Sequence, residues 1–251
     1  MRILLFSDIH GNAVALEAVL ADSVRHGPYD LTICAGDLAW AGPRPAEVCV
    51  RVRELCNDDP TGQSGGGVCV YGNCDQFLLC DAAEGAPQDK NADRFARQQA
   101  WMLDKLSQAD MTFLQRMPFS YQVAPLPGQE LLVVHANPRN VDDALDPSLN
   151  DATLDGVVGD AQFQVLAFGH VHLPSVRLWR GRLLVNVSSV GLPMDGDPRA
   201  AYSVLTWQGG GWQVAQYRVE YDVARVARDM ARNGLPRGRH FAERLLAARY
   251  R

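Results

Sequence analysis

Four of the six histidines in this chain directly follow short apolar runs and stand close to acidic or amide side chains. One histidine in such a place is usually a hydrogen-bonded loop residue, but four in the same context are hard to explain in that way. Imidazole, carboxylate and amide oxygen together suit Mn²⁺, Fe or Zn²⁺ better than Cu(I) or Ca²⁺. The candidate metal ligands are Asp8, His10, Asp37, Asn73, His135, His170 and His172.

Seven ligands exceed what one tetrahedral ion can use. Since a carboxylate can bridge two ions, the set fits a pair of metal ions about 3.5–4 Å apart. Such a pair binds a phosphoryl oxygen and holds a hydroxide opposite the leaving group. The reaction that this arrangement serves best is the hydrolysis of a phosphate ester.

The first ligands follow strands that we expect to lie side by side. Residues 2–7, 31–35 and 68–71 are short apolar runs that predict buried strands, and each ends in a polar cluster. Helical spacing follows the first run from Ala13 and the second from Pro45, whose missing N–H costs nothing at a helix start. In open α/β sheets, ligands bind outside the carboxyl ends of the strands. The sequence therefore predicts one site fed by three loops.

Strand patterns dominate the chain after Pro118. No repeat or linker is visible, so we expect residues 1–251 to form a single domain of two sheets with helices outside, the C-terminal helices of about 222–251 packing on it. Residues 57–67 contain no apolar side chain and predict a mobile surface loop. Further strands are expected at 131–134, 164–168, 183–187, 202–206 and 213–219, and further helices at 93–106, 108–117, 222–233 and 240–248.

Length, composition and charge exclude several classes of protein. The 251 residues are 47% hydrophobic and 21% charged, which is ordinary globular usage and not that of a disordered, collagenous or coiled-coil chain. A net charge of −5 argues against a dedicated nucleic-acid binder. The chain contains no run of about 18 apolar residues, the length that a membrane span needs. The six cysteines form no C-x-x-C pair and no secretory signal is evident, so we expect reduced thiols and a cytoplasmic location.

Five short motifs, in order and each after an apolar run, resemble those of the calcineurin-like metallophosphoesterases. Residues 186–199 also resemble the Asn-Pro-Gly-Ser-Val-Gly-x-Pro segment of the small bacterial and archaeal phosphodiesterase-like branch, so the resemblance covers nearly the whole chain. It implies an α/β fold, a four-layer α/β/β/α sandwich with metals at the strand ends. The motifs are Asp8-x-His10, Gly36-Asp37, Gly72-Asn73-x-Asp75, His135 and Gly169-His170-x-His172.

The resemblance also implies a role for each ligand. The cofactors would be two divalent ions, Mn²⁺ before Fe, Zn²⁺ or Ni²⁺, and the nucleophile a metal-bridging hydroxide. The implied function is a metal-dependent phosphoric ester hydrolase that acts on phosphodiesters or nucleotide-type small molecules. By this resemblance, the first metal is held by Asp8, His10 and His172, the second by Asn73, His135 and His170, and both by Asp37.

The third motif departs from the family pattern at Cys74, where most relatives carry a histidine that is the expected general acid. The same cysteine is familiar in the phosphodiesterase-like branch, so the resemblance stands. No partner cysteine is close in sequence. We therefore interpret Cys74 as a small packing residue under the site rather than as a third-metal ligand or a redox switch.

Further side chains near the motif loops are candidates for other roles. Besides Asp37 and Asn73, we assign Asn12 and Asp75 to the candidate catalytic set, with capping or turn roles as an equal alternative. Three arginines are candidates for holding a distal phosphate of the substrate, although surface arginines are usually only solvated. These are Arg44, Arg139 and Arg199.

Two enzymatic alternatives share the same metal centre, since loops rather than metals set the substrate. They are a phosphoprotein (Ser/Thr) phosphatase and a dinucleoside polyphosphate hydrolase. A non-catalytic interaction scaffold is a third alternative, because a retromer subunit uses this fold for binding. Such a scaffold should have lost part of the ligand set, and here all seven ligands are present.

Overall fold

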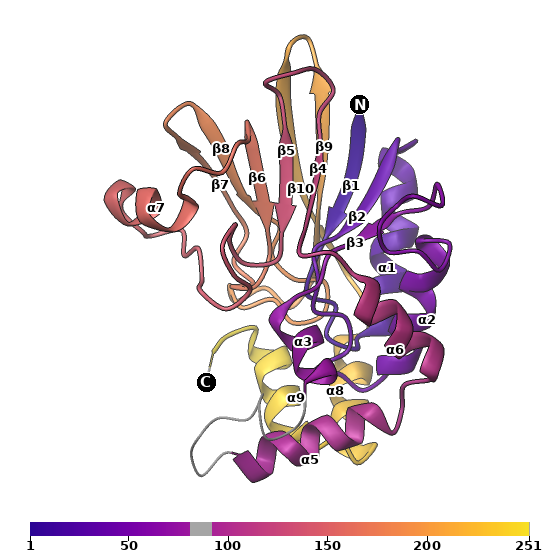
Figure 1. Ribbon diagram of the computed structural model, residues 1–251. Coiled ribbons are helices and arrows are strands. Elements are labelled where there is room, and N and C mark those ends of the chain that lie inside the picture. Colours follow the sequence, from indigo (N-terminus) through magenta and orange to yellow (C-terminus); the bar gives the residue numbers. More distant parts are fainter. Residues whose placement is uncertain (81–91, 251) are drawn as a thin grey trace.

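Two five-stranded sheets stack face to face at the centre of the fold, with helices on both outer sides (Figure 1). The computed structural model describes residues 1–80 and 92–250. The strand order is β10-β9-β1-β2-β3 in the first sheet and β4-β5-β6-β8-β7 in the second. The predicted α/β class with its α/β/β/α layers is confirmed.

Both sheets are mixed. In the first, β1, β2 and β3 are parallel, and β9 and β10 add an antiparallel pair beside β1. In the second, β5, β6 and β8 are parallel, and β4 and β7 are antiparallel edge strands. The strands are β1 (Arg2–Phe6), β2 (Leu31–Cys34), β3 (Val68–Cys69), β4 (Ser120–Val123), β5 (Leu131–Val134), β6 (Val165–Phe168), β7 (Ser175–Trp179), β8 (Arg182–Asn186), β9 (Ala200–Gln208) and β10 (Gly211–Val219).

The helices cover the outer faces and gather below the carboxyl ends of the strands, where α3, α5, α8 and α9 lie in Figure 1. Among the residues that the structure describes, no helix is long and apolar enough to cross a membrane. The helices are α1 (Ala13–Ser23), α2 (Pro45–Leu55), α3 (Asn73–Leu79), α5 (Ala92–Leu103), α6 (Gln108–Arg116), α7 (Asp151–Val158), α8 (Val223–Arg232) and α9 (Gly238–Ala247), with a 3₁₀ turn at Val24–His26.

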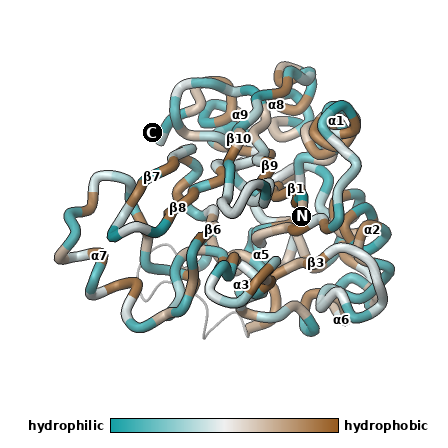
Figure 2. The backbone as a smooth tube through the Cα atoms, turned by 90° about the horizontal axis from the view of Figure 1, so that it is seen from above, coloured by the Kyte–Doolittle hydropathy of each residue, from teal (hydrophilic) through white to brown (hydrophobic). Residues whose placement is uncertain are grey.

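The central strands are apolar on both faces because each face meets another layer. In β1, Ile3 and Leu5 pack into the core between the two sheets, whereas Leu4 and Phe6 face the core under the helices. Strands buried in this way read as continuous apolar runs rather than alternating ones. Figure 2 shows the same pattern from above, with brown segments at β1, β3 and β9.

Local sequence signals start several helices where we expect them. The Asn12 side chain accepts a hydrogen bond from the Ala15 N–H and caps α1. Pro45 stands in the first turn of α2. Ser107 and Asp110 form a reciprocal capping box at the start of α6. The prediction that Pro45 opens a helix is confirmed.

The sequence analysis missed four elements of the fold. Strands β4 and β7 are edge strands with exposed positions, such as Val176 and Leu178, so their residues lack the apolar runs that predict central strands. Helix α3 has seven residues and begins inside a ligand motif. Helix α7 buries only Leu154 and Val158, which gives it a weak apolar stripe.

The loop at residues 57–67, which the sequence predicts as a mobile surface loop, lies on the surface and makes several polar contacts. Its Asp59 carboxylate accepts hydrogen bonds from the Thr61 hydroxyl (2.8 Å) and the Ser64 N–H (3.0 Å), and it pairs with Arg116 at 3.1 Å. The Pro60 carbonyl accepts the N–H of Cys69 on β3. Polar side chains therefore fix a loop that has no apolar anchor.

This geometry predicts that Asp59→Ala loosens the loop while the fold stays intact. Cleavage by a nonspecific protease within residues 57–67 should become about five- to tenfold faster, because several hydrogen bonds that oppose local opening are lost. Gln63→Ala, an exposed change in the same loop, should leave the cleavage rate unchanged. Mass spectrometry of timed digests measures both rates, and equal cleavage of Asp59→Ala and the parent would contradict the account.

Candidate metal centre

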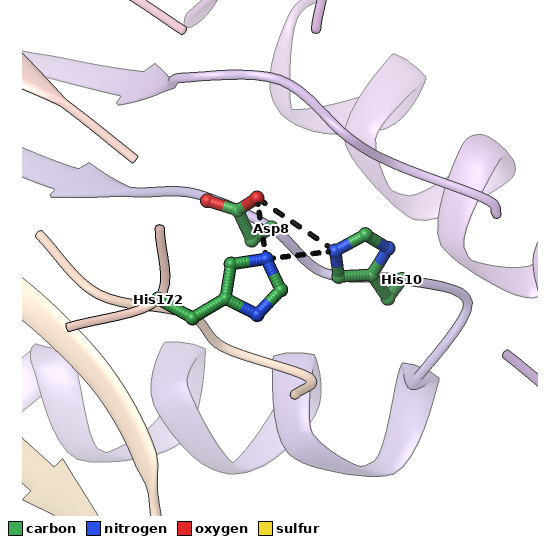
Figure 3. Close-up of side chains that lie close together, drawn as sticks. All are labelled: Asp8, His10 and His172. Atoms are coloured by element: carbon green, nitrogen blue, oxygen red, sulfur yellow. Dashed lines mark hydrogen bonds and ion pairs between the residues drawn. The ribbon is translucent and has the colours of Figure 1, made fainter. Parts of the chain in front are cut away.

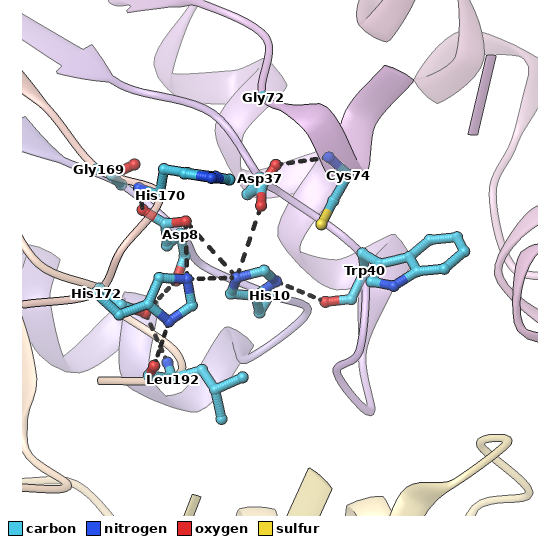
Figure 4. A network of polar contacts seen from close by, with 12 residues as sticks. Asp8, His10, Asp37, Trp40, Gly72, Cys74, Gly169, His170, His172 and Leu192 are labelled. Atoms are coloured by element: carbon cyan, nitrogen blue, oxygen red, sulfur yellow. Dashed lines mark hydrogen bonds and ion pairs between the residues drawn. The ribbon is translucent and has the colours of Figure 1, made fainter. Parts of the chain in front are cut away.

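All seven predicted ligands lie together at the carboxyl ends of strands from both sheets. Figure 4 shows five of them, Asp8, His10, Asp37, His170 and His172. The loops after β1 and β2 run on side by side, since the Asp8 N–H donates to Gly36 O (2.9 Å) and the His10 N–H donates to Asp37 O (3.0 Å). Asn73 opens α3 after β3. The remaining ligands follow β5 (His135) and β6 (His170 and His172).

Asp8, His10 and His172 form the first group of ligands (Figure 3). The Nε2 atoms of His10 and His172 are 3.1 Å apart. Oδ1 of Asp8 lies 3.1 Å from Nε2 of His172 and 3.7 Å from Nε2 of His10. All three side chains are buried. Three potential ligand atoms thus face one small space.

Asn73, His135 and His170 form the second group. Oδ1 of Asn73 lies 3.1 Å from Nε2 of His135 and 3.1 Å from Nδ1 of His170. Asp37 stands between the two groups. Its Oδ2 is 3.8 Å from Nε2 of His10, and its Oδ1 is 3.6 Å from Nε2 of His135. The two oxygens of one carboxylate therefore face different groups.

Backbone carbonyls set the tautomers of all four imidazoles. His10, His135 and His172 each direct Nδ1 at a carbonyl, whereas His170 directs Nε2 at one. Because a carbonyl only accepts, the ring nitrogen beside it carries the hydrogen, and the other nitrogen turns a lone pair to the centre. The accepting carbonyls are those of Trp40 (2.9 Å from His10), Ala35 (2.8 Å from His135), Asp142 (3.0 Å from His170) and Leu192 (next to His172).

Neutral imidazoles held in this way repel one another unless something positive lies between them. Nε2 of His10 lies 3.1 Å from Nε2 of His172, and Nε2 of His135 lies 3.3 Å from Nδ1 of His170, so the lone pairs of each pair of rings face each other. Oδ1 of Asp8 is buried and has no hydrogen-bond partner among the described residues. A divalent cation in each group would satisfy these atoms, so the residues present fit two metal ions.

Backbone strain accompanies the ligands. Five of them have a positive φ in the left-handed region, which side chains other than glycine rarely adopt. Such conformations cost of order 1–3 kcal/mol each and cluster at functional sites. The five residues are Asp8 (φ 55°), His10 (φ 49°), Asp37 (φ 58°), His170 (φ 66°) and His172 (φ 57°).

The electrostatics of the centre follow from burial and from neighbouring ligands. Burial alone lowers the pKa of the His10 imidazole, but Asp8 and Asp37 reverse this and raise it above its ordinary value. Burial acts to raise the pKa of Asp8, yet His172 and His10 hold that pKa well below its usual range. Burial and the neighbouring His135 lower the pKa of His170. The Asp8 carboxylate thus stays ionised and available to a cation.

Asp75 and Asn12 position the ligand loops from behind. The Asp75 carboxylate accepts N–H bonds from Asp37 (2.8 Å), Leu38 (3.0 Å) and Gly72 (2.9 Å), which ties the loops after β2 and β3 together. Burial and Asp37 raise the pKa of Asp75 to about 6. Asn12 caps α1 and donates to Gly191 O at 3.1 Å. Both residues hold backbone, and neither lines the cavity described below.

Two motif glycines are required by close approach to the carboxylates. A Cβ at Gly72 would lie 2.1 Å from Oδ1 of Asp37, and one at Gly169 would lie 2.2 Å from Oδ2 of Asp8. Any side chain at either position would therefore displace a ligand.

Cys74 lies on the wall of the site, whereas the sequence analysis placed it underneath. Its N–H donates to Oδ1 of Asp37 at 2.9 Å, and its Sγ lies within 4.8 Å of ligand atoms of His10 and Asp37. Burial, followed by the charge of Asp37, raises the thiol pKa well above its ordinary value. The side chain is therefore a neutral thiol that faces the centre.

A cavity of about 470 Å³ opens in front of the ligands. Its walls include side chains that the sequence analysis missed, from the loop after β2 (Trp40), α3 (Phe77), α5 (Phe95) and the C-terminal segment (Arg244 and Tyr250). One signal was available: Arg244 stands three residues after Phe241, so it shares a face with an apolar residue of its helix.

The three arginines chosen from the sequence do not line this cavity. Arg44 pairs with Glu47 and Asp229, and Arg199 pairs with Asp197. Arg139 lies in a separate depression beside Tyr71. Among the described residues, the arginines that line the cavity are Arg94, Arg237 and Arg244.

Comparisons with known proteins bear on this geometry. A sequence model of the calcineurin-like phosphoesterase superfamily domain matches residues 1–210. The phosphodiesterase YfcE of Escherichia coli is 28% identical over 219 residues, which cover 82% of this chain and 87% of that protein. An uncharacterized protein of Methanocaldococcus jannaschii is 27% identical over 93% of both chains. The crystal structure of a metallophosphoesterase from Sphaerobacter thermophilus superposes with a TM-score of 0.76 at 28% identity, covering 99% of both chains.

The position of Asp37 predicts that one substitution weakens both ion sites. Asp37→Asn removes the charge and leaves a single amide oxygen, so both metals should be bound less tightly and turnover should be abolished. His172→Ala removes a ligand of the first group only and should lower chiefly that metal. The metal content of the purified variants, measured by mass spectrometry, separates the two outcomes. Two metals per chain in Asp37→Asn would remove the bridging assignment.

Proposed function

The chain belongs to the calcineurin-like phosphoesterase superfamily, and from that premise we propose that it hydrolyses small phosphodiester or nucleotide-type substrates with two divalent metal ions. Membership implies a hydrolase of phosphate esters that uses divalent ions. The number of ions, their identity and the substrate class are the steps that we add.

The observation that carries the proposal is the Asp37 carboxylate, whose two oxygens face two separate groups of ligands. Imidazole nitrogens dominate both groups, and a carboxylate or amide oxygen completes each one. This mixture of donors favours Mn²⁺, with Fe, Zn²⁺ or Ni²⁺ as alternatives.

When bound, the two ions would supply Lewis-acid charge stabilisation and a hydroxide nucleophile near neutral pH. The ligand side chains would hold the ions and orient them. Each imidazole is fixed by its carbonyl partner, and Asp37 and Asn73 complete the two ligand groups. Asn12 and Asp75 act as positioning residues, because their contacts run to backbone rather than to the cavity. No side chain is needed as a nucleophile.

The proton donor that Cys74 offers to the leaving group is a weak one. Cys74 takes the position where a histidine is expected, and a thiol is a poorer hydrogen-bond donor than imidazolium. The raised pKa of the thiol keeps its proton in place. Good leaving groups, which need little protonation, are therefore favoured.

The shape of the cavity favours a small substrate over a phosphoprotein. Phe241 of α9 and Phe95 of α5 line the space in front of the ligands, so a protein loop would meet these helices before it reached the metals. A volume of about 470 Å³ falls in the usual range for small-molecule sites, about 300–1,000 Å³. Because the ligand set is complete, catalysis is favoured over a scaffold role.

A substrate panel tests the proposal. Aryl monoesters, aryl diesters, cyclic nucleotides and dinucleoside polyphosphates are incubated with the chelated protein and with Mn²⁺, Fe²⁺, Zn²⁺ or Ni²⁺ in turn. We expect metal-dependent hydrolysis, fastest with aryl diesters or nucleotide esters. Absence of turnover with every metal, or preference for a phosphopeptide over all small esters, would contradict the proposal.

The chemistry of Cys74 predicts how the hydrolysis rates of two variants depend on the leaving group. Cys74→Ala should lower the rate on nitrophenyl esters by less than about tenfold, well under the 10²–10⁴-fold expected for loss of a true general acid. Cys74→His should raise turnover more for alkyl than for aryl leaving groups, because only the poor leaving groups need the added acid. Rates across leaving groups of graded pKa measure both effects.

The opposite result would reassign the residue. A hundredfold loss in Cys74→Ala that is largest for the poorest leaving groups would make the thiol the general acid. Metal content is measured in parallel, so that a loss of ions is not mistaken for a loss of proton transfer.

A further inference from the structure

The cavity over the metal centre has a cationic wall that comes from the end of the chain. Arg237 and Arg244 line it together with ligands such as His10 and His172. Both arginines lie beyond residues 1–210, the part that the superfamily model matches. These two arginines therefore lie outside the metal-binding motifs that the superfamily shares.

Arg244 is partly buried and has no anionic partner among residues 1–80 and 92–250. Its Nε is buried without a hydrogen bond, and no carboxylate lies within 4.0 Å of its guanidinium among the described residues. The contacts that it does make are weak: Nη2 lies 3.9 Å from Sδ of Met194, and the guanidinium lies 5.2 Å from the centre of the Tyr250 ring. Burial lowers the pKa of Arg244, the opposite direction from Arg44 and Arg53, which are paired with carboxylates.

Burying a guanidinium without an anionic partner costs free energy of folding. We therefore expect its partner to be an anionic group of a bound ligand. Tyr250 holds the wall in place, since its hydroxyl donates to Val171 O at 3.1 Å, and Val171 stands between the ligands His170 and His172. Arg237 adds a second guanidinium, held 5.6 Å from the centre of the Phe241 ring in a left-handed backbone conformation (φ 59°).

We propose that Arg244 and Arg237 bind a second phosphoryl group of the substrate, away from the ester that is hydrolysed. The inference rests on the proposed function and narrows its substrate class to nucleotide-type phosphodiesters that carry an additional phosphate. Guanidinium matches phosphate with paired, charge-assisted hydrogen bonds. The metal ions would neutralise the reacting phosphate, so these arginines are free for another one.

The aromatic wall indicates what joins the two phosphates. Trp40, Phe77 and Phe95 pack edge to face or tilted, with ring centres 5.0–5.6 Å apart, and all three line the cavity. Aromatic faces of this kind accept a nucleobase or another flat apolar group. A nucleoside with two phosphates would place its base and both charges against complementary surfaces.

Two probes that share one leaving group test the proposal. Thymidine 5′-(p-nitrophenyl phosphate) carries the scissile diester alone, and the same compound with a 3′-phosphate adds the second group. For the Mn²⁺-loaded parent, kcat/KM should be at least about tenfold higher for the second probe, the size expected from charge-assisted hydrogen bonds. Arg244→Gln should abolish this preference, and Arg244→Lys should keep part of it. Calorimetry should show that thymidine 3′,5′-bisphosphate binds Arg244→Gln at least about tenfold more weakly than the parent.

Matched variants keep the test decisive. Arg239→Gln alters an exposed arginine of the same helix that does not line the cavity, and it should retain the parental preference. If Arg244→Gln does not fold, as judged by circular dichroism, Arg237→Gln carries the test and should reduce the preference. A parent that hydrolyses both probes equally, or a folded Arg244→Gln with the parental preference, overturns the inference and leaves the proposed function standing. Hydrolysis of neither probe by a protein that turns over the substrate panel overturns the inference alone, whereas no turnover of probes or panel with any metal overturns the proposed function itself.

Discussion

The mutual repulsion of ligand atoms at the ends of the strands is the constraint on which this structure depends. Two pairs of imidazole nitrogens lie only 3.1 Å and 3.3 Å apart, with lone pairs facing each other. A buried carboxylate oxygen of Asp8 has no hydrogen-bond partner among the described residues. Such close imidazole nitrogens favour that arrangement only when positive charge lies among them. The surroundings must therefore impose it, through carbonyls that fix the rings, Asp75 behind the loops and left-handed backbone at the ligands.

The rest of the fold supplies the rigidity that this conflict requires. Parallel strands of both sheets end at one edge, and the core between the sheets fixes the first ligand loops relative to those that carry His135 and His170. Hydrogen bonds then continue from the strands into the loops, as from Asp8 to Gly36 and from Gly169 to His135. The ligands span residues 8–172 of the sequence, so the centre can form only after both sheets have packed. A change that loosens the packing of the two sheets should therefore also disturb the geometry of the site.

The sequence places the seven candidate ligands at one site because each one follows a run that is buried on both faces, and parallel strands bring their carboxyl ends together. It predicts β4 and β7 poorly because edge strands expose one face to water. It does not reveal the contacts of Asp59 within residues 57–67, because these hydrogen bonds have no periodic signature. It also misses Arg244, because sharing a helix face with Phe241 does not show which surface α9 approaches, and tertiary packing decides that.

In the function that we propose, Asp37 lies between two metal ions. Anomalous diffraction from crystals grown with Mn²⁺ tests it most directly, because each ion appears as a separate peak at its own position. The account predicts two peaks about 3.5–4 Å apart, each within bonding distance of a different oxygen of Asp37. A single peak, or a second peak that does not contact Asp37, would contradict it.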